Sequence, residues 1–177
     1  MNSYAAELNR AMRWLAEQRD TVFMGQAVGY PGTAIYGTLE GVPEDRRIEL
    51  PVAEDMQMGQ AIGLALASFV PICIYPRWQF MLLAMNQLVL HLDKLPHYSQ
   101  GGYFPKVIIR VAVPSTTPLD PQAQHQGDYS APVSMLLDNV ELVKITHAEG
   151  IVPAYQQAYH QAEGRSTIIV ERVDRYA

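Results

Sequence analysis

The stretch Glu49-Leu50-Pro51-Val52-Ala53-Glu54, followed by a run of small residues, decides how this chain is organised. Residues 48–52 predict a short buried strand that leaves its sheet at the proline. The small residues then predict a helix with one face almost free of side chains: Gly59, Ala61, Gly63, Ala65 and Ala67. Glycine inside a helix costs about 1 kcal/mol relative to alanine, so this face predicts a closely packed neighbour.

Glu54 lies between the predicted strand and the predicted helix. Open α/β sheets bind ligands outside the carboxyl ends of their strands, so this position suits a catalytic or binding carboxylate. The alternative is an ordinary glutamate in a first helical turn, where its charge interacts favourably with the helix dipole. Spacing alone leaves both interpretations open.

Hydrophobic patterns along the rest of the chain predict alternating helices and strands. The predicted strands are 21–24, 48–52, 71–75, 106–113, 140–145 and 167–173, and the predicted helices are 3–18, 59–67, 79–95, 130–137 and 149–163. This alternation predicts a three-layer α/β/α sandwich around a mostly parallel six-stranded sheet, with residues 1–177 forming a single domain. Helix 79–95 is apolar on most faces, so we expect it to be centrally buried or packed against another chain.

Composition narrows the class of protein. Hydrophobic residues make up 49% of the 177 residues and charged residues 18%, which is typical of a globular protein. A net charge of -5 without a Lys/Arg cluster argues against a nucleic-acid surface. Cys73, the only cysteine, is predicted to be a core residue in a reducing compartment. The sequence shows neither a signal peptide nor a membrane span, so we expect a cytoplasmic protein.

Three side chains beyond Glu54 are candidates for a site. His125 lies in the polar segment 114–128, and loops of that length are usually functional or disordered. An ordinary histidine pKa of about 6.5 suits proton transfer at neutral pH. Trp78 and Phe80 follow a predicted strand end and alternate, so one is expected to face a pocket while the other packs inward. The alternatives are a solvated histidine and two core aromatic residues.

Several motifs, in order along the chain, resemble the thiamine-diphosphate-dependent beta subunits of 2-oxo-acid dehydrogenases, within the transketolase-like superfamily. The matching segments are Leu50-Pro51-Val52-Ala53-Glu54, the small-residue helix, Val70-Pro71-Ile72-Cys73, Trp78-Gln79-Phe80, Ala84-Met85-Asn86-Gln87, Tyr98-Ser99-Gln100-Gly101-Gly102 and Gln124-His125-Gln126. The resemblance spans about Val22 to Glu171. It implies the thiamine-diphosphate-binding fold and, within it, the pyrimidine-binding domain.

The resemblance also implies roles for particular residues. Glu54 takes the catalytic position, where a glutamate hydrogen-bonds a ring nitrogen of the cofactor's aminopyrimidine. Phe80 packs against that ring, and Gln26 and Trp78 are expected to lie at the cofactor too. His125 is expected to act as an acid or base that faces the substrate, a 2-oxo acid or a ketose. The implied reaction is 2-oxo-acid decarboxylation or dehydrogenation, or ketol transfer.

Half of a thiamine site is missing from the sequence. The family holds the diphosphate through Mg²⁺ with a Gly-Asp-Gly motif, and here the nearest match is Gly127-Asp128-Tyr129, which lacks the second glycine. The resemblance therefore implies an alpha-type partner subunit that carries Gly-Asp-Gly and the Mg²⁺, no metal ligand in this chain, and a homodimer or heterotetramer.

The sequence also departs from the family pattern. Gln26 stands where the family usually has an acidic residue, and Leu50 stands where it has threonine. Asp55-Met56-Gln57 replaces a segment with glycine and phenylalanine. These changes leave open an alternative function, a non-catalytic regulatory or scaffold relative that keeps the fold and the oligomer interface.

Overall fold

A computed structural model describes residues 3–113, 116, 120–161 and 164–176. Its strands are β1 (Thr21–Gly25), β2 (Arg47–Glu49), β3 (Val70–Tyr75), β4 (Ile108–Val113), β5 (Glu141–Lys144) and β6 (Thr167–Arg172). Its α-helices are α1 (Ser3–Ala16), α2 (Ala34–Gly37), α3 (Glu54–Leu66), α4 (Trp78–Met81), α5 (Leu95–Tyr98), α6 (Ser130–Ser134) and α7 (Ile151–His160).

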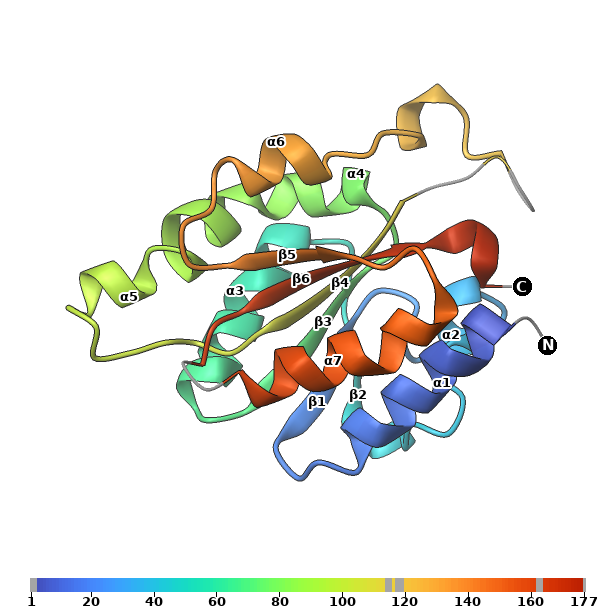
Figure 1. Cartoon of the computed structure of the whole chain (residues 1–177), viewed down its shortest axis with the longest axis horizontal. Coiled ribbons are helices and arrows are strands. Elements are labelled where there is room, and N and C mark those ends of the chain that lie inside the picture. The colour runs from blue at the N-terminus through green and yellow to red at the C-terminus, as the bar shows by residue number, and fades with distance from the viewer. Residues whose placement is uncertain (1–2, 114–115, 117–119, 162–163, 177) are drawn as a thin grey trace.

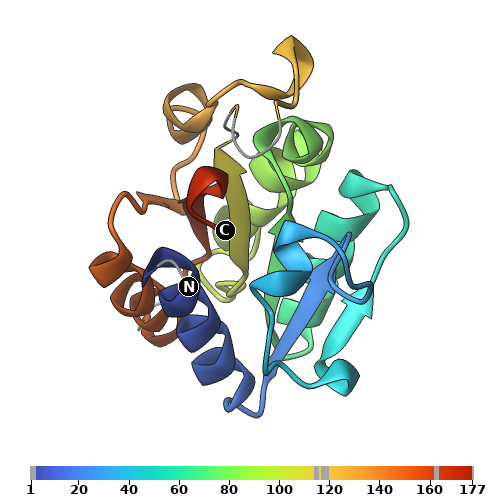
Figure 2. The same ribbon diagram turned by 90° about the vertical axis from the view of Figure 1, so that its right-hand side faces the viewer.

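The six strands form one sheet in the order β2-β1-β3-β4-β6-β5, and every neighbouring pair is parallel. Helices α1 and α7 cover one face of the sheet, while α3 and the helical run from α4 to α5 cover the other (Figures 1 and 2). Parallel strands need crossover connections, and helices supply them here. The predicted α/β sandwich with a parallel sheet is confirmed.

Alternation along the strands divides the core into two layers. Ile72 and Ile74 of β3 point into the layer under α1 and α7, whereas Cys73 and Tyr75 point into the layer under α3 and α4. All four side chains are buried, and successive side chains of a strand point to opposite faces. Cys73 is therefore a core residue, as its apolar surroundings in the sequence predicted.

The predicted buried strand 48–52 is wrong in its bounds and its burial. Strand β2 ends at Glu49, and it lies at the edge of the sheet with β1 as its one neighbour. Val52 is 76% exposed. Pro51 lacks an N–H to donate to a strand ladder, which explains why the strand stops before it.

The predicted continuous helix 79–95 is also wrong. The chain runs through α4, a 3₁₀ turn at Leu82–Ala84 and a π-helical segment at Gln87–Leu92 before α5. Changes of helical pitch alter which residues share a face. Leu88 and Leu92 are consequently buried, while Leu83 is 65% exposed.

The small-residue helix exists, but it begins earlier than predicted, at Glu54. The prediction that its small residues share one open face is wrong: Ala61 and Ala65 are buried in the core layer under α3, whereas Gly63 is exposed. The core of this chain therefore supplies the close neighbour of Ala61 and Ala65, while no other described element lies within 4 Å of a Cβ built on Gly63.

Candidate functional site

The predicted site residues gather at one edge of the sheet because all strands run the same way. Gln26 follows β1, Glu54 follows β2, Phe80 follows β3 and His125 follows β4. These four strands are adjacent in the sheet, in the order β2-β1-β3-β4. Their carboxyl ends point the same way, as the arrowheads in Figure 1 show. Residues far apart in the sequence thus follow strand ends along one rim.

Glu54 is the first residue of α3 and is only 3% exposed. The side-chain amide of Gln26 donates a hydrogen bond to Glu54 Oε1 over 3.1 Å. The hydroxyl of Tyr75, at the end of β3, donates to the backbone carbonyl of Glu54 over 3.0 Å. Burial raises the pKa of Tyr75, so this phenol stays a protonated donor.

These two bonds tie Glu54 to the ends of β1 and β3. The chain leaves β1 towards β2 on one side and leaves β3 towards β4 on the other. Open α/β sheets bind ligands at such a topological switch point. Asp55, the next residue, is exposed and accepts a hydrogen bond from the backbone of Met56. Its surroundings are those of an ordinary first-turn carboxylate.

Phe80 and His125 form the second part of the site. Their rings are stacked, with centroids 5.4 Å apart and planes inclined by 22°. The side-chain amide of Gln79 donates to the backbone carbonyl of Gly127 over 3.3 Å, which ties the segment carrying His125 to α4. Nδ1 of His125 is buried and has no hydrogen-bond partner among the described residues. It is therefore able to accept or donate one further hydrogen bond.

Trp78 and Phe80 have different surroundings. Trp78 is 0% exposed and packs in the core layer under α3 and α4, whereas Phe80 is partly buried at the rim. A cofactor contact by the Trp78 side chain, which the resemblance implies, would require the surrounding core to rearrange. Phe80 is the member of the pair that lies against the other predicted site residue.

Sequence reasoning missed three polar residues of this rim. Glu49 accepts hydrogen bonds from the loop that carries Gln26, Tyr75 binds the backbone of Glu54, and Gln79 holds the His125 segment. The sequence did contain a signal for Glu49, because it is a second carboxylate near the end of β2, the strand that Glu54 follows. Tyr75 and Gln79 had none, since their partners lie far away in the sequence.

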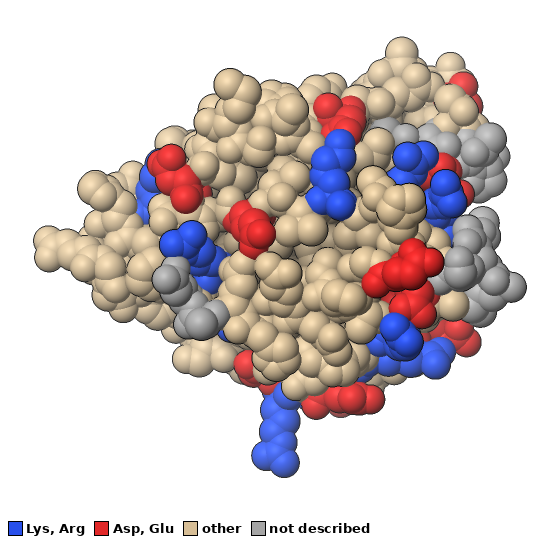
Figure 3. All heavy atoms as spheres, viewed as in Figure 1, with Lys and Arg blue, Asp and Glu red and all other residues tan. Residues whose placement is uncertain are grey.

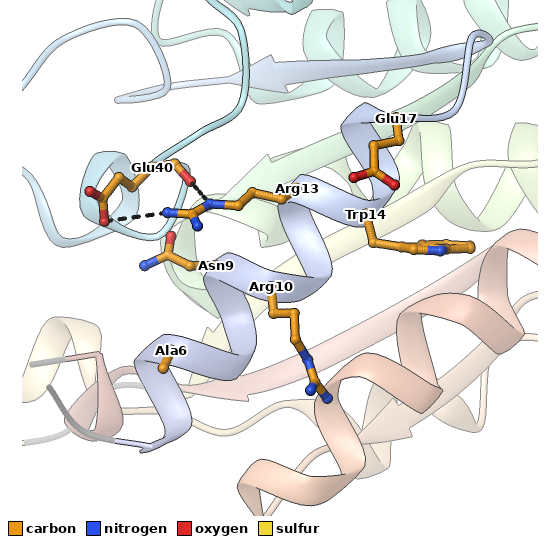
Figure 4. Close-up of a pocket in the computed structure, with 7 residues that line it drawn as sticks. All are labelled: Ala6, Asn9, Arg10, Arg13, Trp14, Glu17 and Glu40. Atoms are coloured by element: carbon orange, nitrogen blue, oxygen red, sulfur yellow. Dashed lines mark hydrogen bonds and ion pairs between the residues drawn. The ribbon is translucent and has the colours of Figure 1, made fainter.

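A further hollow lies away from this rim, along the outer side of α1 (Figure 4). Its volume is about 660 Å³, and it is lined by Ala6, Asn9, Arg10, Arg13, Trp14, Glu17 and Glu40. The side chains of Arg10 and Arg13 point to opposite sides of the helix. Each contacts a carboxylate, Arg10 at 2.6 Å from Glu7 and Arg13 at 3.8 Å from Glu40. The hollow therefore lacks a convergent set of binding groups.

Charges give no further indication of a site on the face drawn in Figure 3. Basic and acidic side chains are interspersed there, and much of the surface over α6 and α5 carries neither. A smaller groove of about 390 Å³ lies between the sheet edge and α3, lined by Met24, Ile48, Leu50, Gln60, Gly63 and Leu64. It is almost entirely apolar, so it resembles a packing surface more than a reaction site.

Comparison with known proteins places this geometry in context. The chain is 37% identical over 93 residues to the pyruvate dehydrogenase E1 component subunit beta of Chaetosphaeridium globosum, covering 49% of this chain and 28% of that protein. It is 30% identical over 112 residues to the 2-oxoisovalerate dehydrogenase subunit beta of Bacillus subtilis, covering 61% and 34% respectively. A third relative, the mitochondrial pyruvate dehydrogenase beta subunit of Chaetomium thermophilum, is 32% identical over 145 residues, covering 73% and 37%.

Solved structures agree on the fold. A split-gene transketolase described as an inactive beta4 tetramer superposes with a TM-score of 0.71 at 15% identity, covering 94% of this chain and 50% of that one. A thiamine-diphosphate-dependent 4-hydroxybenzoylformate decarboxylase of Rhodococcus jostii superposes with a TM-score of 0.63 at 20% identity, covering 96% and 31%. No protein-family model matches the chain.

The chain is thus related in sequence to 2-oxo-acid dehydrogenase beta subunits, and it shares its fold with a split-gene transketolase and with a thiamine-diphosphate-dependent decarboxylase. It spans well under two thirds of the curated relatives it matches, between 28% and 37% of the three above. Within the described part of the chain, every helix is too short or too polar to cross a membrane.

Proposed function

We propose that this chain is the pyrimidine-binding part of a thiamine-diphosphate-dependent enzyme, and that a diphosphate-binding partner completes its active site. The observation that carries the proposal is Glu54: a buried carboxylate at the switch point of a parallel sheet, bound to the ends of both flanking strands. The similarity to 2-oxo-acid dehydrogenase beta subunits supports the choice of cofactor.

The residues present fit an aminopyrimidine. That ring offers nitrogen atoms, an amino group and a flat aromatic face. Only Oε1 of Glu54 is engaged by a described side chain, through Gln26, so the carboxylate keeps capacity for a ring nitrogen. Phe80 offers a partly buried aromatic face, and contacts of that kind contribute about 0.5–1.5 kcal/mol beyond area burial. Residues 1–177 are then a single pyrimidine-binding domain.

The chain's own residues have distinct tasks in this proposal. When bound, the cofactor supplies the nucleophilic carbon that attacks a carbonyl, and the protein supplies binding, orientation and proton transfer. Glu54 holds the proton that it shares with the pyrimidine ring. His125, stacked on Phe80 and with Nδ1 unpartnered, moves a proton to or from a substrate oxygen. The substrate is a 2-oxo acid or a ketose.

The partner follows from what the sequence lacks. Without Gly-Asp-Gly, this chain has no counterpart of the family's diphosphate and Mg²⁺ motif. We infer an alpha-type subunit that carries both, docked along the exposed face of α3, the helix that begins at Glu54. Gly63 lies in open space there and Met56 is exposed, so the face can receive another helix closely. We expect the assembly, either a homodimer of this chain or a heterotetramer that includes the alpha-type subunit, to be cytoplasmic.

Binding of the cofactor's pyrimidine fragment tests the proposal without the partner. The probe is 4-amino-5-hydroxymethyl-2-methylpyrimidine, titrated into the labelled chain and followed by NMR. We expect shifts at Gln26, Glu54 and Phe80, and we expect Glu54→Ala to abolish them. Asp55→Ala is the matched control, because it removes the exposed carboxylate of the same turn. Shifts that survive Glu54→Ala would contradict the proposal. An unmodified chain that shows no shifts would also contradict it, because a non-catalytic scaffold is expected to give no response.

A further inference from the structure

Glu49 makes an unusual set of contacts for a residue at the edge of a sheet. Its Oε1 accepts a hydrogen bond from the backbone N–H of Ala27 over 2.8 Å. Its Oε2 accepts two more, from Val28 over 2.8 Å and from Gly29 over 2.7 Å. Three successive backbone N–H groups therefore converge on one carboxylate. Such a concavity, called a nest, binds anions, and here the anion is a side chain of the protein itself.

The loop that forms this nest has little conformational freedom. Ala27 has a φ of 62°, in the left-handed region that an alanine rarely occupies without compensating contacts. Gly25 has a φ of 151°, and a Cβ there would lie 2.4 Å from the carbonyl oxygen of Ile74. A Cβ on Gly29 would lie 3.2 Å from Cβ of Glu49. The loop is thus shaped around its neighbours on both sides.

Gln26 lies inside this loop, between Gly25 and the first N–H of the nest. Its side chain is the one that donates to Glu54 Oε1. Strand pairing places Glu49 opposite Gly25, so the carboxylate is anchored at the point where the loop leaves the sheet. Arg47, two residues earlier on β2, donates to the carbonyl of Val28 over 3.3 Å and holds the same loop from its other side.

We propose that Glu49 is a positioning residue: its carboxylate fills the nest of residues 27–29 and thereby holds Gln26 against Glu54. The role in catalysis rests on the proposed function, whereas the positioning itself does not. Hydrogen bonds to a charged acceptor are roughly twice as strong as neutral ones, so the negative charge of Glu49 is what closes the loop. A glutamine side chain at position 49 would have one acceptor oxygen, and its NH₂ group would point towards backbone N–H groups of the nest, which are themselves donors.

The test compares Glu49→Gln and Glu49→Ala with Glu44→Gln, which neutralises an exposed glutamate in the 3₁₀ turn preceding the same strand. NMR hydrogen exchange is measured at the amides of Val28 and Gly29. We expect exchange to quicken at least about tenfold in both Glu49 variants and to stay unchanged in Glu44→Gln. Sodium acetate should slow exchange again in Glu49→Ala, because acetate can enter the emptied nest, and sodium chloride at equal ionic strength should not.

A second measurement separates positioning from general support of the fold. The ¹³C resonance of the Glu54 carboxyl is followed at fixed pH in Glu49→Gln, in Gln26→Ala and in the double variant. If Glu49 acts through Gln26, both single variants shift this resonance and the double variant shifts it no further than Gln26→Ala alone. Gln26→Ala keeps Glu49 and the nest. Its effect on the Glu54 resonance can therefore be measured even if Glu49→Ala does not fold.

Two outcomes would overturn the inference. One is unchanged exchange at residues 28 and 29 in Glu49→Gln. The other is a shift of the Glu54 resonance that adds fully in the double variant. Neither measurement uses cofactor or partner. A failure here would therefore leave the proposed function standing, and a failure of pyrimidine binding would leave the positioning role of Glu49 standing.

Discussion

Glu54 and Asp55 are adjacent carboxylates in the same helical turn, and their surroundings give them different chemistry. Glu54 is buried and bound to Gln26, while Asp55 faces solvent. A buried carboxylate beside a ligand can exchange a proton with it without competition from bulk water. Position at a strand end identified Glu54 as a candidate from the sequence, but its contact with Gln26 could not be predicted, because it depends on the pairing of β1 with β2.

In the assembled enzyme, we expect Glu54→Gln to leave folding and assembly intact while it removes most turnover. Glutamine still hydrogen-bonds a ring nitrogen but cannot exchange a proton, and general acid–base groups contribute roughly 100- to 10,000-fold. The measurement is hydrogen–deuterium exchange at the thiazolium carbon of the bound cofactor. Asp55→Asn is the control. An exchange rate that Glu54→Gln leaves unchanged would refute the assignment, whatever turnover shows.

His125→Ala should affect a different step. Because His125 lies on Phe80 in the segment after β4, we expect it to slow a substrate-dependent step by roughly 100-fold or more while exchange at the cofactor stays fast. Single-turnover kinetics with enzyme in excess over substrate, beside the exchange measurement on the bound cofactor, separates the two steps. His147→Ala, an exposed histidine far along the chain, is the matched control. Equal slowing of both steps would mean that His125 only supports the fold.

Trp78 marks the limit of sequence reasoning at this scale. Alternation predicted that one ring of the Trp78 and Phe80 pair would face a pocket, and the structure places Phe80 against His125 while Trp78 is in the core. Which of the two rings faces the core depends on the rotational phase of α4 relative to β3. The sequence of one short helical turn does not determine that phase.

At the scale of elements, alternation of helix and strand predicted nearly every segment, and local irregularities escaped it. Apolar residues recur throughout 79–95, so the sequence favours one helix, yet the backbone passes through 3₁₀ and π geometry. The run packs against α3, and a contact between elements of this kind is not visible in a local pattern. The predicted strand 48–52 extends beyond β2 for a similar reason, because an apolar run does not show whether a strand lies in the middle or at the edge of a sheet.

The exposed face of α3 predicts association. Gly63 has open space around it, and Leu66 on the same side is 50% exposed. We expect Gly63→Leu to weaken self-association or hetero-association by roughly 1–3 kcal/mol through overpacking. Sedimentation equilibrium measures it, with Gly37→Leu as the control because Gly37 also borders open space. A wild-type chain that remains a stable monomer at micromolar concentration would sink this prediction.

A second element-scale prediction concerns Asp93, which fixes the end of the π-helical segment to the start of β5. Its buried carboxylate accepts backbone hydrogen bonds from Asp138, Asn139 and Val140, and Lys94 lies 2.9 Å away. Burial opposes ionisation, but Lys94 and the backbone donors together hold the pKa of Asp93 below its usual value. A lowered pKa in the folded state stabilises the protein at pH values above the unfolded-state pKa of 3.8.

We therefore expect Asp93→Asn to lower the free energy of unfolding by about 1.5–3 kcal/mol at neutral pH. The difference from the wild type should shrink as the pH falls below 3.8, through the folded-state pKa, because the wild-type carboxylate then becomes neutral. Urea unfolding at several pH values measures it. Asp138→Asn removes the exposed partner of Lys94 and should cost less than 1 kcal/mol. An Asp93→Asn effect independent of pH would show that the charge is unimportant.

At the scale of the whole molecule, alternation of elements predicted the α/β class and the parallel sheet, but strand order was out of reach. The order β2-β1-β3-β4-β6-β5 depends on contacts between segments far apart in sequence. That order brings Gln26, Glu54, Phe80 and His125 to one rim. The sequence could therefore name the members of the site, through strand ends and family resemblance, without showing which of them touch.

The last prediction follows from the incomplete site. We expect the isolated chain to bind thiamine diphosphate weakly and with little dependence on Mg²⁺, because the rim offers groups for a pyrimidine but the sequence lacks Gly-Asp-Gly for the diphosphate. The diphosphate is the most highly charged part of the cofactor. Without an opposite charge on the protein, it gains little by leaving water, where charges interact only weakly. Calorimetry on the purified chain, with and without Mg²⁺, measures both quantities.

Two controls make that titration decisive. Inorganic pyrophosphate should give no measurable heat, and the aminopyrimidine alcohol should bind about as well as the whole cofactor, since both present the same ring to Glu54. Addition of the diphosphate-binding partner should then raise affinity for the cofactor and make it depend on Mg²⁺, while affinity for the aminopyrimidine alcohol changes much less. Tight, Mg²⁺-dependent binding by this chain alone would mean that it holds the diphosphate half, and the roles given to Glu54 and Phe80 would fall with that result.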